Sequence, residues 1–227
     1  LMGECVEVLE TTKDFWKVKC LYDGYEGWCQ KSQLTEVEDH FYNNNHQFLT
    51  AQPITTALCN GKSIFLPGGS FIGCFNHEVL AIGNTTITFP ETPFQFKELN
   101  EDVNIYEVLH PYINVPYLWG GKSIFGIDCS GFAQQIYKML DIKLPRDAYQ
   151  QAVEGVAVGF LQEAQLGDLA FFDNEEGRIT HVGIILNDEH IIHASGKVRV
   201  DKIDNMGIVN TETNERTHKL RLIKRFL

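Results

Sequence analysis

Residues 126–140 read GIDCSGFAQQIYKML, and this stretch decides the fold of the second half of the chain. Its apolar side chains recur at spacings of three and four from Phe132 to Leu140, the period of one face of a helix. We expect a helix that starts at Cys129 and ends before Pro145. A thiol at a helix start lies at the positive end of the helix dipole, which favours the thiolate, and its backbone N–H can donate to an oxyanion. Cys129 is therefore a candidate nucleophile.

Two histidines downstream are candidates for the base and its partner. His181 opens an apolar run, and Gly183, on the same side of that strand, leaves space beside the imidazole. A base needs a partner that fixes its tautomer, and the next run offers His190 and His193. Residues three apart point to opposite faces of a strand, so only one can face the Cys129 helix. Small residues follow His193, whereas His190 follows a turn, so we expect His193 to be the partner and His190 to lie at the solvent edge.

A metal site is the competing interpretation of Cys129, His181 and His193. The chain has no Cys-x-x-Cys pair and no close-spaced ligand pairs of the kind usual in zinc sites, so we expect neither a metal nor a cofactor. The other cysteines are expected to be small apolar core residues. These are Cys5, Cys20, Cys29, Cys59 and Cys74.

The first hundred residues consist of short alternating runs broken by turn residues, the pattern of small all-β modules. We expect one module over residues 1–38, a second over 46–93, and a third domain over 95–227. A linker over 39–45, a helix over 94–109 and strands over 168–172, 181–186, 190–194 and 220–225 complete the prediction. A helix followed by antiparallel strands indicates an α+β domain. Residues 1–8 resemble a strand already under way, so we expect further sequence ahead of them. Trp28 and Trp119 are expected to pack in the interior.

Charge excludes some partners. The 227 residues contain 19 Lys and Arg against 30 Asp and Glu, a formal net charge of -11 that would repel nucleic acid and anionic membranes alike. The sequence has no apolar run of the roughly 18 residues that a membrane span needs. We therefore expect no nucleic-acid partner, no membrane span and, as given, no signal sequence.

The chain resembles the NlpC-type cell-wall peptidases, papain-like hydrolases of bacterial peptidoglycan peptides. The resemblance covers about residues 95–227 and rests on blocks that stand in the family's order. They are Tyr117-Leu118-Trp119-Gly120-Gly121, Asp128-Cys129-Ser130-Gly131-Phe132, Leu144-Pro145-Arg146-Asp147, Gly167-Asp168-Leu169, His181-Val182-Gly183-Ile184 and His193-Ala194-Ser195. The preceding modules resemble bacterial SH3-like domains. The implied fold is an α+β papain-like catalytic domain, with the nucleophile helix packed on an antiparallel sheet, behind small SH3-like barrels of which the first is N-terminally incomplete.

The resemblance also implies roles for individual residues. Cys129 would be the nucleophile, His181 the base and His193 the third, polar member of the triad. The remaining roles are Tyr117 at the oxyanion, Asp128 and Ser130 on the substrate side, and Arg146 and Asp147 shaping the cleft.

Within this family the chain is most similar to the γ-D-glutamyl-L-diamino acid endopeptidases, of the dipeptidyl-peptidase VI type. These cut after L-Ala-γ-D-Glu and need a free N-terminal L-alanine. Asp128 would pair with that amine, and Tyr25 or Glu26 of an SH3-like module would close the cleft to longer chains. The implied partners are stem peptides of a bacterial wall, acted on by an assumed monomer in either the cytoplasm or the envelope. A thiol acyltransferase or amidase of the same fold, and a non-catalytic wall-binding protein, are the alternatives.

Overall fold

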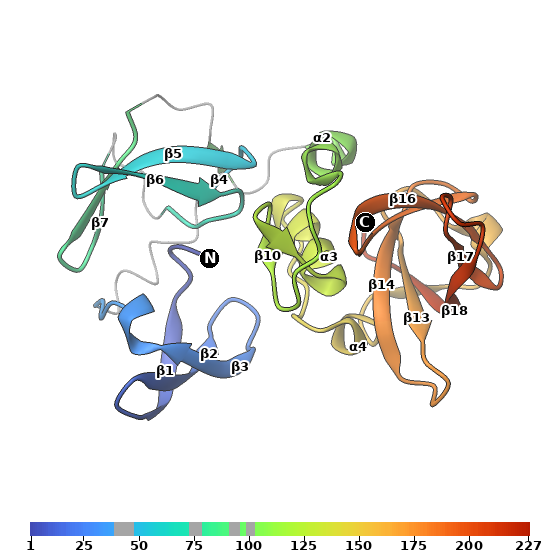
Figure 1. Ribbon diagram of the computed structural model, residues 1–227, viewed down its shortest axis with the longest axis horizontal. Coiled ribbons are helices and arrows are strands. Elements are labelled where there is room, and N and C mark those ends of the chain that lie inside the picture. The colour runs from blue at the N-terminus through green and yellow to red at the C-terminus, as the bar shows by residue number, and fades with distance from the viewer. Residues whose placement is uncertain (39–47, 73–78, 91–95, 99–102) are drawn as a thin grey trace. The chain divides into compact units, whose positions relative to one another are not determined.

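The computed structural model describes residues 1–38, 48–72, 79–90, 96–98 and 103–227 (Figure 1). The chain divides into two compact units, Leu1–Asp102 and Val103–Leu227, and each is described by itself. The expected linker, residues 39–45, lies outside the described residues.

The first unit begins with a three-stranded antiparallel sheet in the order β1-β2-β3. Its strands are β1 (Val6–Thr11), β2 (Phe15–Cys20) and β3 (Glu26–Gln30), followed by the 3-10 turn η1 (Lys31–Gln33). The β2–β3 hairpin is confirmed, and its turn needs Gly24, whose φ of 73° is open to glycine at little cost. The expected strand over residues 1–8 begins only at Val6, after a turn in which the Glu4 N–H donates to the Leu1 carbonyl at 3.2 Å.

The rest of the first unit holds a four-stranded sheet in the order β6-β5-β8-β7 and a two-stranded pair, β4 with β9. The strands are β4 (Phe48–Thr50), β5 (Ile54–Cys59), β6 (Lys62–Pro67), β7 (Val79–Ile82), β8 (Thr85–Thr88) and β9 (Phe96–Glu98). The expected helix over 94–109 is wrong in its first half, because β9 pairs with β4 there. Among the described residues of this range only α2 (Ile105–Leu109) is helical, starting where the Asn104 side chain accepts a hydrogen bond of 3.0 Å from the Tyr106 backbone N–H.

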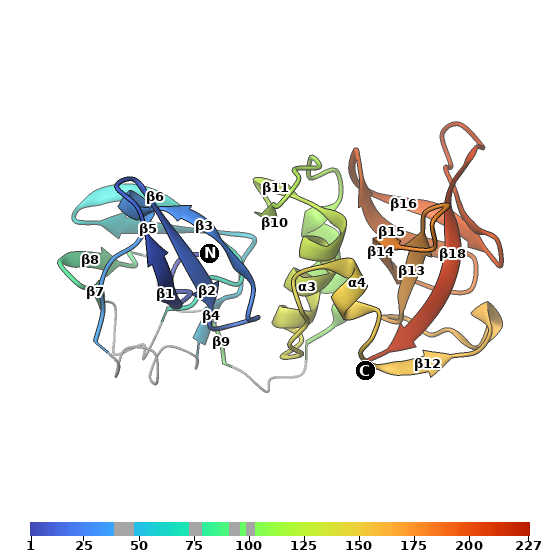
Figure 2. The ribbon, with the colours of Figure 1, turned by 90° about the horizontal axis from the view of Figure 1, so that it is seen from below.

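The second unit combines one principal helix with a closed antiparallel sheet. The helix, α3 (Cys129–Met139), begins at the predicted residue. The sheet runs β12-β18-β13-β14-β15-β16-β17, and β17 also pairs with β18. The fold prediction is therefore confirmed only in part: α3 packs on β14 and β15 as expected (Figure 2), but the sheet closes on itself as a barrel. The elements are η2 (His110–Tyr112), β10 (Lys122–Ser123), β11 (Gly126–Ile127), α4 (Ala148–Gln151), β12 (Val156–Val158), η3 (Leu161–Glu163), β13 (Leu169–Asp173), β14 (Ile179–Ile185), β15 (His190–Ser195), β16 (Lys197–Asp204), β17 (Gly207–Val209) and β18 (Arg216–Arg225).

The two faces of this sheet build two cores. Val182, Ile184, Ile192 and Ala194 pack with α3 in one apolar cluster. Residues of alternate parity on the same strands form a second cluster with Phe172, on the other face. This alternation fixes where the histidines lie.

Several burial predictions are wrong. Trp28 is 51% exposed and Trp119 is 87% exposed, so neither packs in an interior. Among the described cysteines only Cys129 is buried, while Cys5, Cys20, Cys29 and Cys59 are half-buried; Cys74 lies outside the described residues. No helix in the described ranges is long and apolar enough to cross a membrane.

Candidate active site

The Asp128 side chain is the N-cap of α3, the helix that carries Cys129. Asp128 has an extended backbone and its Oδ1 accepts a hydrogen bond of 2.7 Å from the Gly131 N–H, an N-cap that satisfies one free donor of the first turn. Gly131 must be glycine, because a Cβ there would lie 2.3 Å from the Gly121 carbonyl oxygen. The loop that ends at Asp128 therefore fits closely against the first turn of α3.

The Asp128 carboxylate is already occupied by groups of this unit. Arg146 binds both oxygens, with Nη2–Oδ2 at 2.6 Å and Nη1–Oδ1 at 3.1 Å. The Gly120 N–H donates to Oδ2 at 2.8 Å, and the Ser130 hydroxyl donates to Oδ1 at 3.4 Å. Arg146 also donates to Ser130 Oγ at 2.9 Å. A substrate amine at Asp128 would have to share the carboxylate with these donors, so that predicted role stays a prediction.

The structure brings His181 and His193 together as predicted. Nε2 of His181 lies 2.8 Å from Nδ1 of His193, and both side chains are buried. Gly183 lies opposite His193 in the β14–β15 pairing, and a Cβ on it would meet the His193 Cβ at 2.9 Å. The glycine thus leaves room for His193. His190, by contrast, is half-buried at the strand end, with its Nδ1 3.1 Å from the Asn187 side-chain oxygen.

The expectation that His193, rather than His190, faces the Cys129 helix is wrong, because the residues of β15 that pack with α3 are Ile192 and Ala194. Val182 faces α3, and strand alternation turns His181 to the other face, where its ring lies 5.7 Å from that of Phe172. The backbone of this strand acts on the thiol, because the Val182 N–H is one of the groups that lower the pKa of Cys129. The thiol at the helix start therefore lies close to the backbone one residue from His181 along β14.

Sequence reasoning missed two residues beside the histidine pair. Asp201 Oδ2 lies 3.0 Å from Nε2 of His193, on the side away from His181. His218 stacks on His181 with ring centres 4.1 Å apart and the planes at 25°. The one available signal for Asp201 was an acid in the alternating run 197–204, next to the His193 strand, and that run also holds Asp204. Nothing local in the sequence points to His218, which comes from the far strand β18.

Burial keeps the Cys129 thiol and the imidazoles of His181 and His218 uncharged. It raises the pKa of the Cys129 thiol above its ordinary value, and the Asp128 charge raises it further, against backbone hydrogen bonds that lower it. Burial likewise lowers the pKa of His181 well below its ordinary value, with His218 and His193 adding to the effect, and lowers the pKa of His218 to about 4. The helix dipole alone predicted a thiolate, but at this site desolvation is the larger effect.

The charge of the Cys129 thiolate influences the pKa of Tyr117. Burial, followed by the charges of Cys129 and Asp128, raises its pKa to about 12. The phenol therefore keeps its proton at neutral pH and can donate a hydrogen bond, which is what a residue at an oxyanion must do.

Three histidines of the site lie close enough together to bind a metal ion. One ligand atom from each of His181, His193 and His218 lies within 4.8 Å of the others. Both ring nitrogens of His193 are nevertheless engaged, one with His181 and one with Asp201. The hydrogen-bonded chain accounts for these nitrogens without a metal.

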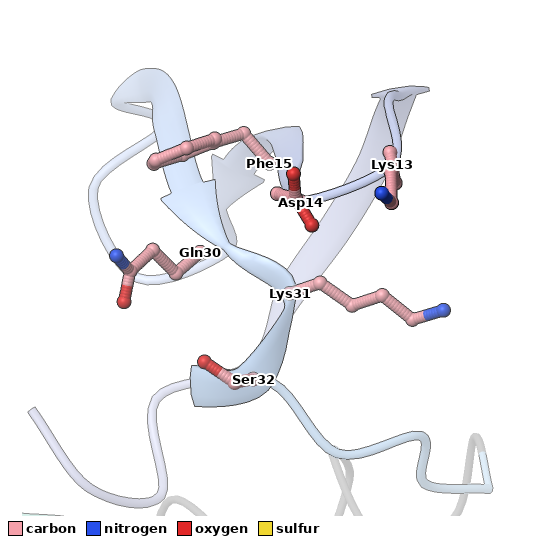
Figure 3. Close-up of a pocket in the computed structure, with 6 residues that line it drawn as sticks. All are labelled: Lys13, Asp14, Phe15, Gln30, Lys31 and Ser32. Carbon is pink, nitrogen blue, oxygen red and sulfur yellow. The ribbon is translucent and has the colours of Figure 1, made fainter.

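The remaining predicted residues are Asp147 in the second unit and Tyr25 and Glu26 in the first. Asp147 caps α4 in a capping box with Gln150. In the first unit, Tyr25 is 43% exposed and Glu26 forms a surface ion pair with Lys17 at 3.0 Å. Their contact with substrate stays a prediction. A shallow pocket in that unit is lined by none of the predicted residues (Figure 3); it is formed by Lys13, Asp14, Phe15, Gln30, Lys31 and Ser32.

The pKa directions predict how the resting thiol reacts. Iodoacetamide should alkylate Cys129 slowly at pH 7, and the rate should still rise above pH 9, because the reactive thiolate forms only above the raised pKa. Because its pKa is lowered, His181 remains a neutral base even below pH 6.5, so kcat/KM should not fall as the pH drops below that value. The measurement is mass spectrometry of the Cys129 peptide after timed alkylation. Half-maximal alkylation below pH 7 would instead indicate a resting thiolate–imidazolium pair.

Two family models match the chain, one in each of its two units. The family model described as "NlpC/P60 family" matches residues 114–217, and that described as "Bacterial dipeptidyl-peptidase Sh3 domain" matches residues 1–34. A γ-D-glutamyl-L-lysine dipeptidyl-peptidase of Bacillus cereus is 28% identical over 86% of this chain and 66% of its own length. Dipeptidyl-peptidase 6 of Lysinibacillus sphaericus is 28% identical over 90% of this chain and 83% of its own length.

A solved structure is similar over the whole chain. The crystal structure of an NlpC/P60 family protein from Bacillus cereus matches with a TM-score of 0.83 and 24% identity, over 100% of this chain and 81% of that one. At this identity the match speaks for the fold. The chain therefore carries an NlpC/P60 domain at residues 114–217, behind a bacterial dipeptidyl-peptidase SH3 domain at residues 1–34.

Proposed function

We propose that the protein is a cysteine peptidase that hydrolyses the bond between γ-D-Glu and the diamino acid in peptidoglycan-derived peptides with a free N-terminal L-Ala. The observation that carries the proposal is the buried pair of His181 on β14 and His193 on β15, next to Val182, whose backbone N–H lowers the pKa of the Cys129 thiol. The names of the two dipeptidyl-peptidase relatives support the choice of bond.

The proposed reaction uses Cys129 as the nucleophile on the γ-carbonyl of D-Glu. His181 takes the thiol proton, and Nδ1 is the nitrogen left for it, since Nε2 is engaged by His193. The thiol sulfur bonds to the carbonyl carbon, the tetrahedral oxyanion is stabilised by the Cys129 N–H and the Tyr117 hydroxyl, and the imidazolium returns its proton to the leaving amine. Water then hydrolyses the thioester, with His181 again as base.

The test is incubation with L-Ala-γ-D-Glu-L-Lys and with its meso-diaminopimelate counterpart in water enriched in ¹⁸O. We expect release of L-Ala-γ-D-Glu carrying one ¹⁸O in the new carboxylate, read by product mass. The same peptide acetylated on the L-Ala amine is the matched control and should not be cut. Product that forms only when an amine acceptor is added would point to an acyltransferase, and no product from any peptide would contradict the proposal.

A further inference from the structure

The Asp201 carboxylate lies at the end of the histidine pair and is fixed from several sides. Besides its contact with His193, its Oδ1 accepts hydrogen bonds from the Thr211 N–H at 2.8 Å, the Thr211 hydroxyl at 2.9 Å and Arg199 Nη2 at 3.0 Å. The side chain is 2% exposed. Although burial alone would raise its pKa, the hydrogen bonds from His193, Arg199 and Thr211 hold it well below its usual range. Asp201 is thus a carboxylate, which can only accept hydrogen bonds.

An acceptor at this position dictates where the protons of the two histidines lie. His193 Nε2, at 3.0 Å from Asp201 Oδ2, must carry a hydrogen. While the His193 ring is neutral it carries only one hydrogen, so its Nδ1 is then a bare acceptor. His181 Nε2, at 2.8 Å from that acceptor, must then carry the hydrogen of its own ring. His181 Nδ1 is consequently unprotonated.

We propose that Asp201 is a positioning residue that sets the tautomers of both His193 and His181, so that His181 presents a bare Nδ1 to the Cys129 thiol. The identity of the thiol as proton donor rests on the proposed function, whereas the two tautomers do not. Asp201 acts through two rings in series and touches neither the nucleophile nor the substrate.

The substitution Asp201→Asn tests this role directly, because the neighbouring donors determine the orientation of the side-chain amide. The Thr211 N–H and Arg199 Nη2 can only donate, so the amide oxygen must take the Oδ1 position. The amide NH₂ then faces His193 Nε2. Arg199 Nε, 2.7 Å from Oδ2, also favours an oxygen there, but this one contact is outweighed by the two donors that hold the oxygen at the Oδ1 position. A donor at this point reverses both tautomers and places a hydrogen on His181 Nδ1.

The direct test is ¹⁵N NMR of protein labelled on histidine, in the Cys129→Ala background so that no thiolate–imidazolium pair can form. Signals of the two rings are assigned from His181→Gln and His193→Gln. We expect both rings to carry hydrogen on Nε2 in the parent, and both on Nδ1 after Asp201→Asn. Unchanged tautomers in a folded Asp201→Asn protein, checked by circular dichroism, would overturn the proposal.

Activity gives the second readout, in protein that retains Cys129. Asp201→Asn should lower kcat by about 100-fold or more, with KM nearly unchanged, because a reversed tautomer cannot accept the thiol proton. Asp201→Ala removes the acceptor without adding a donor. It should therefore lower kcat less than Asp201→Asn does, although asparagine is closer to aspartate in shape. A merely structural role predicts the opposite order, and that order would overturn the proposal.

Asp204→Asn is the matched control. Asp204 lies on the same strand, β16, and binds Arg216 through both oxygens at the surface. Its replacement should leave both tautomers and kcat unchanged, and an equal loss of kcat there would also count against Asp201. If the parent cuts none of the peptides, the proposed function fails, and the NMR result alone then supports or overturns the role of Asp201.

Discussion

Replacing Cys129 with alanine is expected to abolish the release of L-Ala-γ-D-Glu, with kcat falling by about 10⁴-fold or more. Without the sulfur no thioester forms, and water in its place would have to attack the amide directly. Cys129 is 7% exposed at the first turn of α3, and alanine fits that position in a helix. The fold should therefore survive, and the measurement is the initial rate of dipeptide release at saturating peptide, beside a circular dichroism spectrum.

The control for this substitution is Cys29→Ala, which removes a half-buried free thiol of the first unit and should leave the rate unchanged. Undiminished release by the Cys129 variant would mean that another group attacks the substrate. Loss of activity in both variants would point to damage unrelated to the nucleophile.

Periodicity in the sequence located the elements of the site but not their full geometry. The three-and-four spacing predicted α3 to begin at Cys129, as it does, because one helix face must pack on the sheet. Strand parity separated His193 from His190, and the structure buries His193 against His181. Both results follow from local repeats, which a single sequence displays.

Long-range pairing is what the sequence could not supply. Closure of the sheet depends on β17 meeting β18, and this closure places His218 on the ring of His181. Asp201 reaches His193 only because β15 and β16 pair in a register that sets Arg199 opposite His193. The wrong helix over 94–109 has the same origin, since a strand partner far back in the chain, β4, decides the conformation of β9.

Replacing Arg146 with methionine is expected to destabilise the second unit by about 3–5 kcal/mol, the usual cost of leaving a buried charge without its partner. Asp128 and Arg146 are each 7% exposed, so water cannot replace the guanidinium without opening the site. The effect should reach the catalytic helix, because Asp128 is also its N-cap. Urea unfolding followed by circular dichroism measures the change in the free energy of unfolding.

Two further variants separate the buried charge from lost packing. Arg216→Met removes an arginine of similar size from a surface pair with Asp204, and should cost clearly less because solvent screens that pair. Adding Asp128→Asn to Arg146→Met removes the stranded charge while keeping an N-cap oxygen, so it should recover part of the lost stability. If the double variant is no more stable than Arg146→Met, the loss comes from packing of the arginine stem rather than from the unpaired carboxylate.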